Sequence, residues 1–173
     1  MSFELPSVLD LHKTNHSWAL VVVAFFLALF PRIWAVLLGA GNKIYDPKSP
    51  RDFPTALRNC RDLNDKVRGR LIRSECALNN AFENLPLFAI AVLAANLEGV
   101  DLWILNFFSY NYILCRAVYT WIYIWGQEDD YMHPLTRSMV WFASQFILGM
   151  MFLLPGCGKK YEVFARATIS RSI

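Results

Sequence analysis

The sequence predicts an all-α fold, an integral membrane four-helix bundle built as a single domain over residues 1–173. Composition is the first reason. The chain is 55% hydrophobic and only 18% charged, whereas soluble domains average about 25% charged residues. Its long apolar stretches are the second reason, because a helix needs about 20 such residues to cross a bilayer core of about 30 Å. The third is a set of ionisable residues inside those stretches.

The first predicted span is Trp18–Gly39, an apolar run interrupted only by Pro31 and Arg32. The run is too long for the apolar part of a signal peptide, and no basic segment precedes it. We therefore expect a retained anchor. Arg32 has no evident partner in the sequence, so snorkelling and a place in a subunit interface both stay open, and no ligand role is assigned to it.

The second predicted span is Ala77–Leu97, although its uninterrupted apolar run, Leu85–Leu97, is short. The extension back to spanning length takes in four polar residues, Asn79, Asn80, Glu83 and Asn84. A core helix of a soluble protein is the alternative, but the neighbouring spans favour a membrane helix with a polar end. The preceding loop, Asn42–Arg73, is polar, and its proline-free second half, Thr55–Arg73, is a candidate helix that would lead into this span.

The third predicted span, Leu102–Trp125, follows the second after the very short linker Glu98–Asp101. A linker of that length predicts a tight antiparallel pair of helices. The fourth predicted span is Leu135–Leu154, and we expect Pro155 and the glycines after it to end the helix. The basic tail, residues 156–173, is interpreted as an interfacial helix or as disordered.

Lysine and arginine counts in the loops predict the orientation. The long first loop carries Lys43, Lys48, Arg51, Arg58, Arg61, Lys66, Arg68 and Arg70. The N-terminus and the tail, on the opposite side, carry Lys13, Lys159, Lys160, Arg166 and Arg171. We therefore expect the first loop to face the cytosol, although the basic tail argues against this.

Charge and cysteine usage exclude several classes of function. A net charge of +3 gives no indication of a nucleic-acid partner. The three histidines lie far apart in the sequence, so no metal site is expected. The cysteines show no paired spacing and are interpreted as free thiols, namely Cys60, Cys76, Cys115 and Cys157.

Ionisable residues within the spans are the main functional signal, because each costs at least about 2.5 kcal/mol at membrane depth. They form one stripe on each of three predicted helices: Arg73, Asn80, Glu83 and Asn84 on the second, Tyr112, Arg116, Tyr119 and Tyr123 on the third, and Arg137 with Ser138 on the fourth. Glu83 can pair with an arginine such as Arg116, and the excess of arginines indicates an anionic ligand. The alternative is that these groups only fasten the helices together.

At these residues the chain resembles the MAPEG family, the membrane-associated proteins of eicosanoid and glutathione metabolism, over about residues 17–155. The most specific part is Arg73-Ser-Glu-Cys-Ala-Leu-Asn-Asn80-Ala-Phe-Glu83-Asn84-Leu-Pro-Leu-Phe88. Arg116-x2-Tyr119-x3-Tyr123 and His133-Pro-Leu-Thr-Arg137-Ser138 also match family patterns. Among its branches, the microsomal glutathione transferases are the expected relatives.

The resemblance implies a homotrimer that binds glutathione between subunits from the cytosolic side. Its ligand residues would be Arg73, Asn80, Glu83, Asn84, Arg116, Tyr119 and Tyr123, and Arg137 would be the catalytic arginine beside the thiol. Lipophilic electrophiles or lipid hydroperoxides would enter from the bilayer, so the chain would be a transferase or peroxidase. We expect the endoplasmic reticulum membrane, with the mitochondrial outer membrane as the alternative.

Departures from the family pattern keep other functions open. Some members carry arginines at the end of the first helix, where this chain has Leu37-Leu38-Gly39-Ala40. Some have an arginine in place of Cys76 or a histidine in place of Leu78, and the acidic run Glu128-Asp129-Asp130 lies near the expected anion site. These differences argue against a dedicated leukotriene or prostaglandin synthase. The alternatives are a non-catalytic protein of this fold that binds a lipid or protein partner and, less favoured, a channel or transporter.

Overall fold

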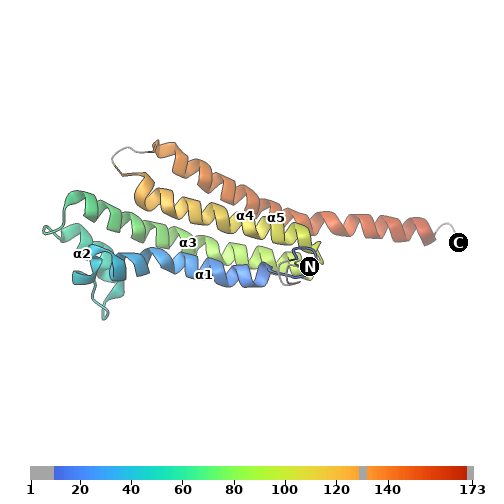
Figure 1. The fold of residues 1–173 in the computed structure, drawn as a ribbon. Helices are drawn as coiled ribbons and strands as arrows, with labels where there is room; N and C mark the ends of the chain where they lie inside the picture. The colour runs from blue at the N-terminus through green and yellow to red at the C-terminus, as the bar shows by residue number, and fades with distance from the viewer. Residues whose placement is uncertain (1–9, 129–131, 171–173) are drawn as a thin grey trace, which may run out of the picture.

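The structure is a computed structural model that describes residues 10–128 and 132–170, and of residues 38, 134 and 156–170 only the backbone (Figure 1). Helix α1 spans Ser17–Ile33 and continues as the π-helical turn η2, Trp34–Leu38. Helix α3 is Asp65–Leu97 and helix α4 is Leu102–Trp121, which continues as the π-helical turn η5, Ile122–Gly126. Helix α5 is Pro134–Ser170. The described part of the chain contains no strand, as expected for an all-α fold.

Three short helices connect α1 to α3. They are the 3-10 helices η3, Ala40–Lys43, and η4, Pro50–Asp52, and the helix α2, Phe53–Asn59. Phe53 and Leu57 of this segment are buried against Ala35 of η2 and Leu71 near the start of α3. The first loop is therefore folded onto the bundle rather than extended from it.

The long helices lie side by side (Figure 1). Helix α1 packs against α3 and α4, and α5 packs against α4 and α3. One end of the bundle carries α2, the first turns of α3 and the α4–α5 connection, and we name it the loop end. The other end, named the far end, carries the start of α1 and the α3–α4 turn, and α5 runs on past it (Figure 1).

Length and composition qualify three helical segments to cross a membrane, Ser17–Leu37, Asp65–Leu97 and Leu135–Pro155. Large apolar side chains also point outward on α1 and α5. Phe26 is 61% exposed and Phe146 is 70% exposed, as expected for side chains that face lipid rather than water. These observations indicate a multi-pass membrane protein. Helix α4, with 20 residues, is long enough to span but less apolar, so its crossing remains a prediction.

The tight turn between α3 and α4 depends on two residues. Gly99 has φ +67°, a left-handed conformation that glycine adopts without steric cost after the end of a helix. Asp101 then caps α4, because its side chain accepts hydrogen bonds from the backbone N–H groups of Trp103 and Ile104. The turn is as short as expected, but the predicted tight pairing of the two helices is limited, because α3 packs mainly against α1 and α4 mainly against α5.

The helical boundaries differ from the expectation at two places. The candidate helix Thr55–Arg73 is wrong as a continuous element, because α2 ends at Asn59 and α3 begins at Asp65, where the Asn64 side chain accepts from the Lys66 N–H. The expectation that Pro155 ends the fourth helix is also wrong, because the backbone stays helical to Ser170. Proline removes only one backbone donor, and membrane helices tolerate that loss.

Candidate functional site

The loop-end half of the bundle contains a cavity of about 340 Å³. Helices α3, α4 and α5 all contribute to its wall, with the lining residues Asn80, Tyr119, Arg137, Ser138, Trp141 and Phe142. Three of the eight predicted site residues, Asn80, Tyr119 and Arg137, therefore meet at one cavity. They come from three different helices, as the three polar stripes predicted.

Arg137 is the cation with the most freedom to bind a ligand in this cavity. Its guanidinium carbon lies 4.4 Å from the centre of the Tyr123 ring, which places a cation–π contact on one face of the group. Among the described residues, Arg137 has no ion-pair partner and no hydrogen-bond partner. Its donors are thus available to an anion, while Tyr123 holds the group in place.

Arg116 lies deeper, with only 4% of its surface exposed. Its Nη2 donates to Asn80 Oδ1 at 2.7 Å, and its guanidinium carbon lies 4.8 Å from the Tyr119 ring centre. Within the described part of the chain, its Nη1 is buried without a hydrogen-bond partner. The suggested pairing of Arg116 with Glu83 does not form in this chain, because Arg116 is buried in the bundle whereas Glu83 is exposed on its surface.

The stripe on α3 divides into residues with different surroundings. Asn84 is 6% exposed, donates to the Asn80 carbonyl at 2.8 Å and accepts from Gln145 Nε2 at 2.7 Å. Glu83, its neighbour in sequence, is exposed, and no described residue forms a hydrogen bond or ion pair with it. Asn84 therefore fastens α3 to α5, whereas Glu83 lies on the outside of the subunit. Gln145 was not predicted from the sequence, although a polar residue within an apolar span could have indicated it.

Arg73 does not line the cavity. Its Nε and Nη2 both donate to the backbone carbonyl of Ile124, at 3.3 and 3.1 Å. One turn earlier on α3, Arg70 forms an ion pair with Glu128. Both arginines therefore reach the residues that follow α4, and Arg70 offsets the charge of Glu128, part of the acidic run near the expected anion site.

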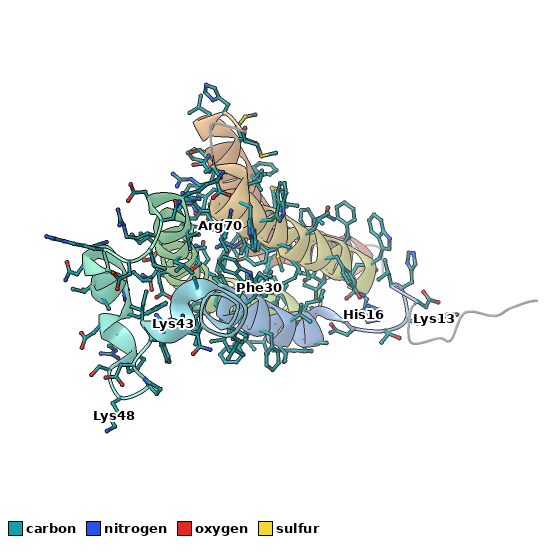
Figure 2. The ribbon with its side chains drawn as sticks, turned by 60° about the vertical axis from the view of Figure 1, so that its left-hand side comes forward. Lys13, His16, Phe30, Lys43, Lys48 and Arg70 are labelled. Carbon is teal, nitrogen blue, oxygen red and sulfur yellow. The ribbon has the colours of Figure 1, made fainter. Side chains whose placement is uncertain are left out.

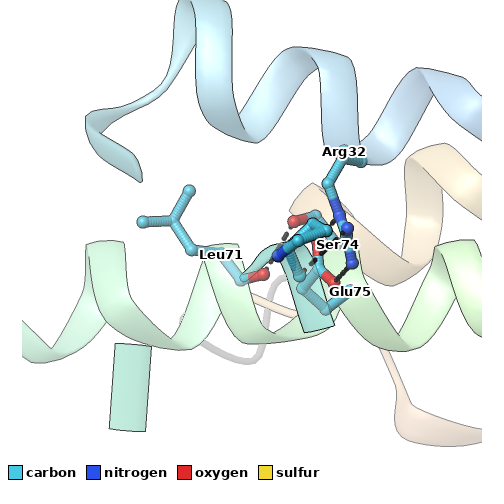
Figure 3. Close-up of polar contacts among 5 residues, drawn as sticks. Arg32, Leu71, Ser74 and Glu75 are labelled. Atoms are coloured by element: carbon cyan, nitrogen blue, oxygen red, sulfur yellow. Dashed lines mark hydrogen bonds and ion pairs between the residues drawn. The ribbon is translucent and has the colours of Figure 1, made fainter. Parts of the chain in front are cut away.

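Figure 3 shows a pair that the sequence analysis missed, Arg32 on α1 and Glu75 on α3. Arg32 Nε donates to Glu75 Oε1 at 2.8 Å, and the second carboxylate oxygen accepts from Arg32 Nη2. The remaining amino group, Nη1, donates to the Pro50 carbonyl at 3.2 Å. The Glu75 side chain is only 3% exposed. The pair therefore joins α1, α3 and the segment before α2. Within this chain Arg32 thus has an internal partner, which neither snorkelling nor a place in a subunit interface describes.

Thiols and metal ligands are sparse in this region. Cys60, Cys76 and Cys115 are free and half-buried, and the side chain of Cys157 lies outside the described residues. The structure describes the side chains of residues 10–128 and 132–155, apart from 38 and 134. Among these residues, no group of three His, Cys, Asp or Glu side chains could hold a metal ion. The chemistry available at the cavity is thus that of a guanidinium, an amide, hydroxyls and aromatic rings.

Comparison with known proteins gives one match. The model of the MAPEG family matches residues 17–157, a region that contains all eight predicted site residues and the whole cavity lining. No curated protein and no solved structure matches the chain.

Proposed function

The chain belongs to the MAPEG family, and from this premise we propose that it is a membrane-bound glutathione transferase or peroxidase of the microsomal type that acts on lipophilic substrates. The family includes glutathione-dependent enzymes and non-catalytic members, so membership alone does not decide the activity. The observation that carries the proposal is the cavity in which Arg137, next to Asn80 and Tyr119, presents a guanidinium that has no ion-pair or hydrogen-bond partner among the described residues.

The chemistry asked of Arg137 is thiolate stabilisation. A thiol with a pKa of about 8.5 is mostly protonated at neutral pH, yet only the thiolate is a strong nucleophile. A guanidinium stays protonated throughout this range, so it favours the thiolate electrostatically and donates hydrogen bonds to it without acting as an acid. The thiolate then attacks an electrophilic carbon and displaces the leaving group. Alternatively, it attacks a hydroperoxide oxygen, the O–O bond breaks and the alcohol leaves, and a second glutathione reduces the resulting sulfenic acid to the disulfide and water.

The other cavity residues fit a peptide ligand with a lipophilic co-substrate. Asn80 and Tyr119 offer hydrogen bonds, and Ser138 adds a hydroxyl beside Arg137. Trp141 and Phe142 form an apolar side of the cavity, and Phe142 is 65% exposed on the outer surface of α5. A lipophilic molecule dissolved in the bilayer thus has a direct approach to the thiol.

The assembly proposed is a homotrimer in the endoplasmic reticulum membrane, with the loop end in the cytosol. The exposed position of Glu83 supports this arrangement, because an unpaired carboxylate at membrane depth is expensive unless a neighbouring subunit or a ligand contacts it. The ligand roles of Arg73, Glu83, Asn84, Arg116 and Tyr123 stay predictions under this proposal. Of these, Asn84, Arg116 and Tyr123 directly contact residues of the cavity.

The test is glutathione binding to the purified full-length protein in nanodiscs, followed by ultraviolet thiolate absorbance and by conjugation of a generic aryl halide. Arg137→Ala should lower the thiolate fraction and the conjugation rate at neutral pH by about 10-fold to 100-fold, the effect of removing an adjacent positive charge. Arg51→Ala, an exposed arginine at the same end, is the matched control and should change neither. Full activity of Arg137→Ala would contradict its assigned role.

A second candidate is a non-catalytic MAPEG-fold protein that binds a lipid or a protein partner. The observation that favours it is the number of arginines with internal partners, since Arg32, Arg73 and Arg116 all bond to groups of this chain. Absence of glutathione binding, together with a lipid retained through purification, would support this candidate over the enzyme.

A further inference from the structure

Two arginines one turn apart on α3, Arg70 and Arg73, reach the same short stretch at the end of α4. Arg73 donates twice to the Ile124 carbonyl, and Arg70 pairs with the Glu128 carboxylate four residues later. Figure 2 shows Arg70 on α3 beside the helices at the loop end. Neither residue lines the cavity of the proposed active site.

The stretch that they hold is the π-helical turn η5 and the residues after it. The last carbonyls of any helix lack partners within the helix. Ile124 is fully buried, so water is a poor substitute donor for its carbonyl, and Arg73 supplies the hydrogen bonds instead. A positive side chain at this position also complements the negative end of the helix dipole. On its other side, η5 packs against η2, the continuation of α1, through Trp125 and Trp34, whose ring centres are 5.0 Å apart.

The same turn carries Tyr123, the residue immediately before Ile124. The Tyr123 ring supports the guanidinium of Arg137 at 4.4 Å, and Arg137 lines the cavity. The contacts therefore form a continuous series from Arg73 through the η5 backbone and the Tyr123 ring to Arg137. Any shift of this backbone would move the ring on which Arg137 rests.

We propose that Arg73, assisted by Arg70, is a positioning residue that holds the end of α4 so that Tyr123 keeps Arg137 at the cavity. Arg73 acts without touching the ligand, in contrast to the binding role that its place in the sequence motif implies. Only the catalytic part of this inference rests on the proposed function. The structural part, that Arg73 fixes η5, holds for any ligand.

Hydrogen–deuterium exchange of the full-length protein in nanodiscs tests the structural part. Arg73→Met removes both hydrogen bonds to Ile124 and should speed exchange of the backbone amides over residues 122–128 by about tenfold, the effect of losing a hydrogen bond to a charged group. Exchange in residues 103–118 of α4 should not change. Arg68→Met is the matched control, because this arginine lies on the same helix and pairs with the exposed Asp65. Unchanged exchange over residues 122–128 would overturn the proposal.

A double-mutant cycle tests the catalytic part with the pH dependence of the bound glutathione thiolate. Arg73→Met should raise the pH at which the thiolate forms, and it should have no further effect once Arg137→Ala is present, because it acts only through Arg137. If the effects of the two substitutions were additive, Arg73 would contact the ligand directly, which contradicts the proposal. Arg73→Lys, which keeps a charged donor for the carbonyl, should restore most of the signal and covers the case in which Arg73→Met fails to fold.

The two failures are distinguishable. If the wild-type protein binds no glutathione but Arg73→Met still speeds exchange at residues 122–128, the proposed enzyme activity is wrong and the positioning role stands. If glutathione binds and forms a thiolate that Arg73→Met leaves unaltered, the positioning role is wrong and the enzyme activity stands.

Discussion

The two ends of the bundle use polar side chains in different ways. At the far end, the fully buried Asn106 donates to the carbonyls of Leu11 and Thr14, both at 2.8 Å, and accepts from the His16 N–H at 2.9 Å. Asn15 and Asn96 are joined side chain to side chain. These groups are neutral amides whose hydrogen-bonding capacity is used within the chain, so they fasten the N-terminal segment across the helices.

The loop end contains charged groups with unused donors and acceptors. Among the described residues, the buried side-chain atoms without a partner are Arg70 Nε, Arg116 Nη1 and Glu128 Oε1, and all three belong to the loop-end half. Figure 2 shows this end, with Lys43, Lys48 and Arg70, opposite Lys13 and His16 of the far end. Arg70 and Glu128 pair with each other, whereas Arg116 bonds to the cavity residue Asn80, so the Arg116 Nη1 is the unused buried donor that lies nearest the cavity. The difference is that the far-end amides are satisfied within the chain, whereas the loop end keeps buried donors and acceptors without a partner among the described residues.

The largest expected effect on stability is at the Arg32–Glu75 pair. Glu75→Gln removes one charge of a buried pair and leaves the arginine uncompensated, which should cost about 3 kcal/mol of unfolding free energy. The measurement is thermal unfolding in detergent micelles. If the variant unfolds at the same temperature as the wild-type protein, this pair contributes as little to stability as an exposed ion pair and does not stabilise the loop end.

The far-end network should have the next largest effect. Asn106→Ala removes three hydrogen bonds and leaves two carbonyls unsatisfied, which should cost about 2–3 kcal/mol. Glutathione affinity should stay at the wild-type value, because the cavity lies at the other end. A variant that lost binding while it kept its stability would break the contrast between the two ends.

Asn80→Ala should lower glutathione affinity as well as stability. It removes the acceptor of the buried Arg116 and one cavity residue, so stability should fall by about 2 kcal/mol, the cost of a buried charged donor that loses its partner, while glutathione affinity falls by roughly tenfold, as for one lost hydrogen bond to a charged group. Calorimetric titration measures the affinity and thermal unfolding the stability. If Asn80→Ala lowered stability and left glutathione affinity unchanged, as expected for Asn106→Ala, Asn80 would only fasten helices.

The smallest effect is expected at Lys13, whose side chain is 77% exposed in its pair with Asp10. Exposed ion pairs contribute little to stability. Lys13→Ala should therefore leave both the unfolding temperature and glutathione binding unchanged, and it sets the baseline for the other variants. A clear loss of stability would mean that the N-terminal segment depends on more than the amide network.

Much of the fold and part of the site were predictable from local sequence. The long apolar runs indicate the membrane helices, because bilayer thickness sets a length that few soluble helices combine with so little charge. The spacing of Tyr119 and Tyr123 on one helical face and the position of Arg137 near the start of α5 predicted residues that do meet at or beside one cavity. The family signature, confirmed over residues 17–157, rests on the same residues.

Partner choice was decided only by the tertiary structure. Arg32 binds Glu75 across 43 residues, Arg116 binds Asn80 across 36, and Arg73 binds a carbonyl across 51. Helical periodicity says which face a side chain occupies, but not which neighbouring helix lies opposite or how the two are offset along their axes. The sequence by itself thus determined that arginines would lie inside a membrane bundle. Packing of the helices determined that Arg32 and Arg73 bind groups of the chain itself, whereas Arg137 contacts the Tyr123 ring and has no hydrogen-bond acceptor among the described residues.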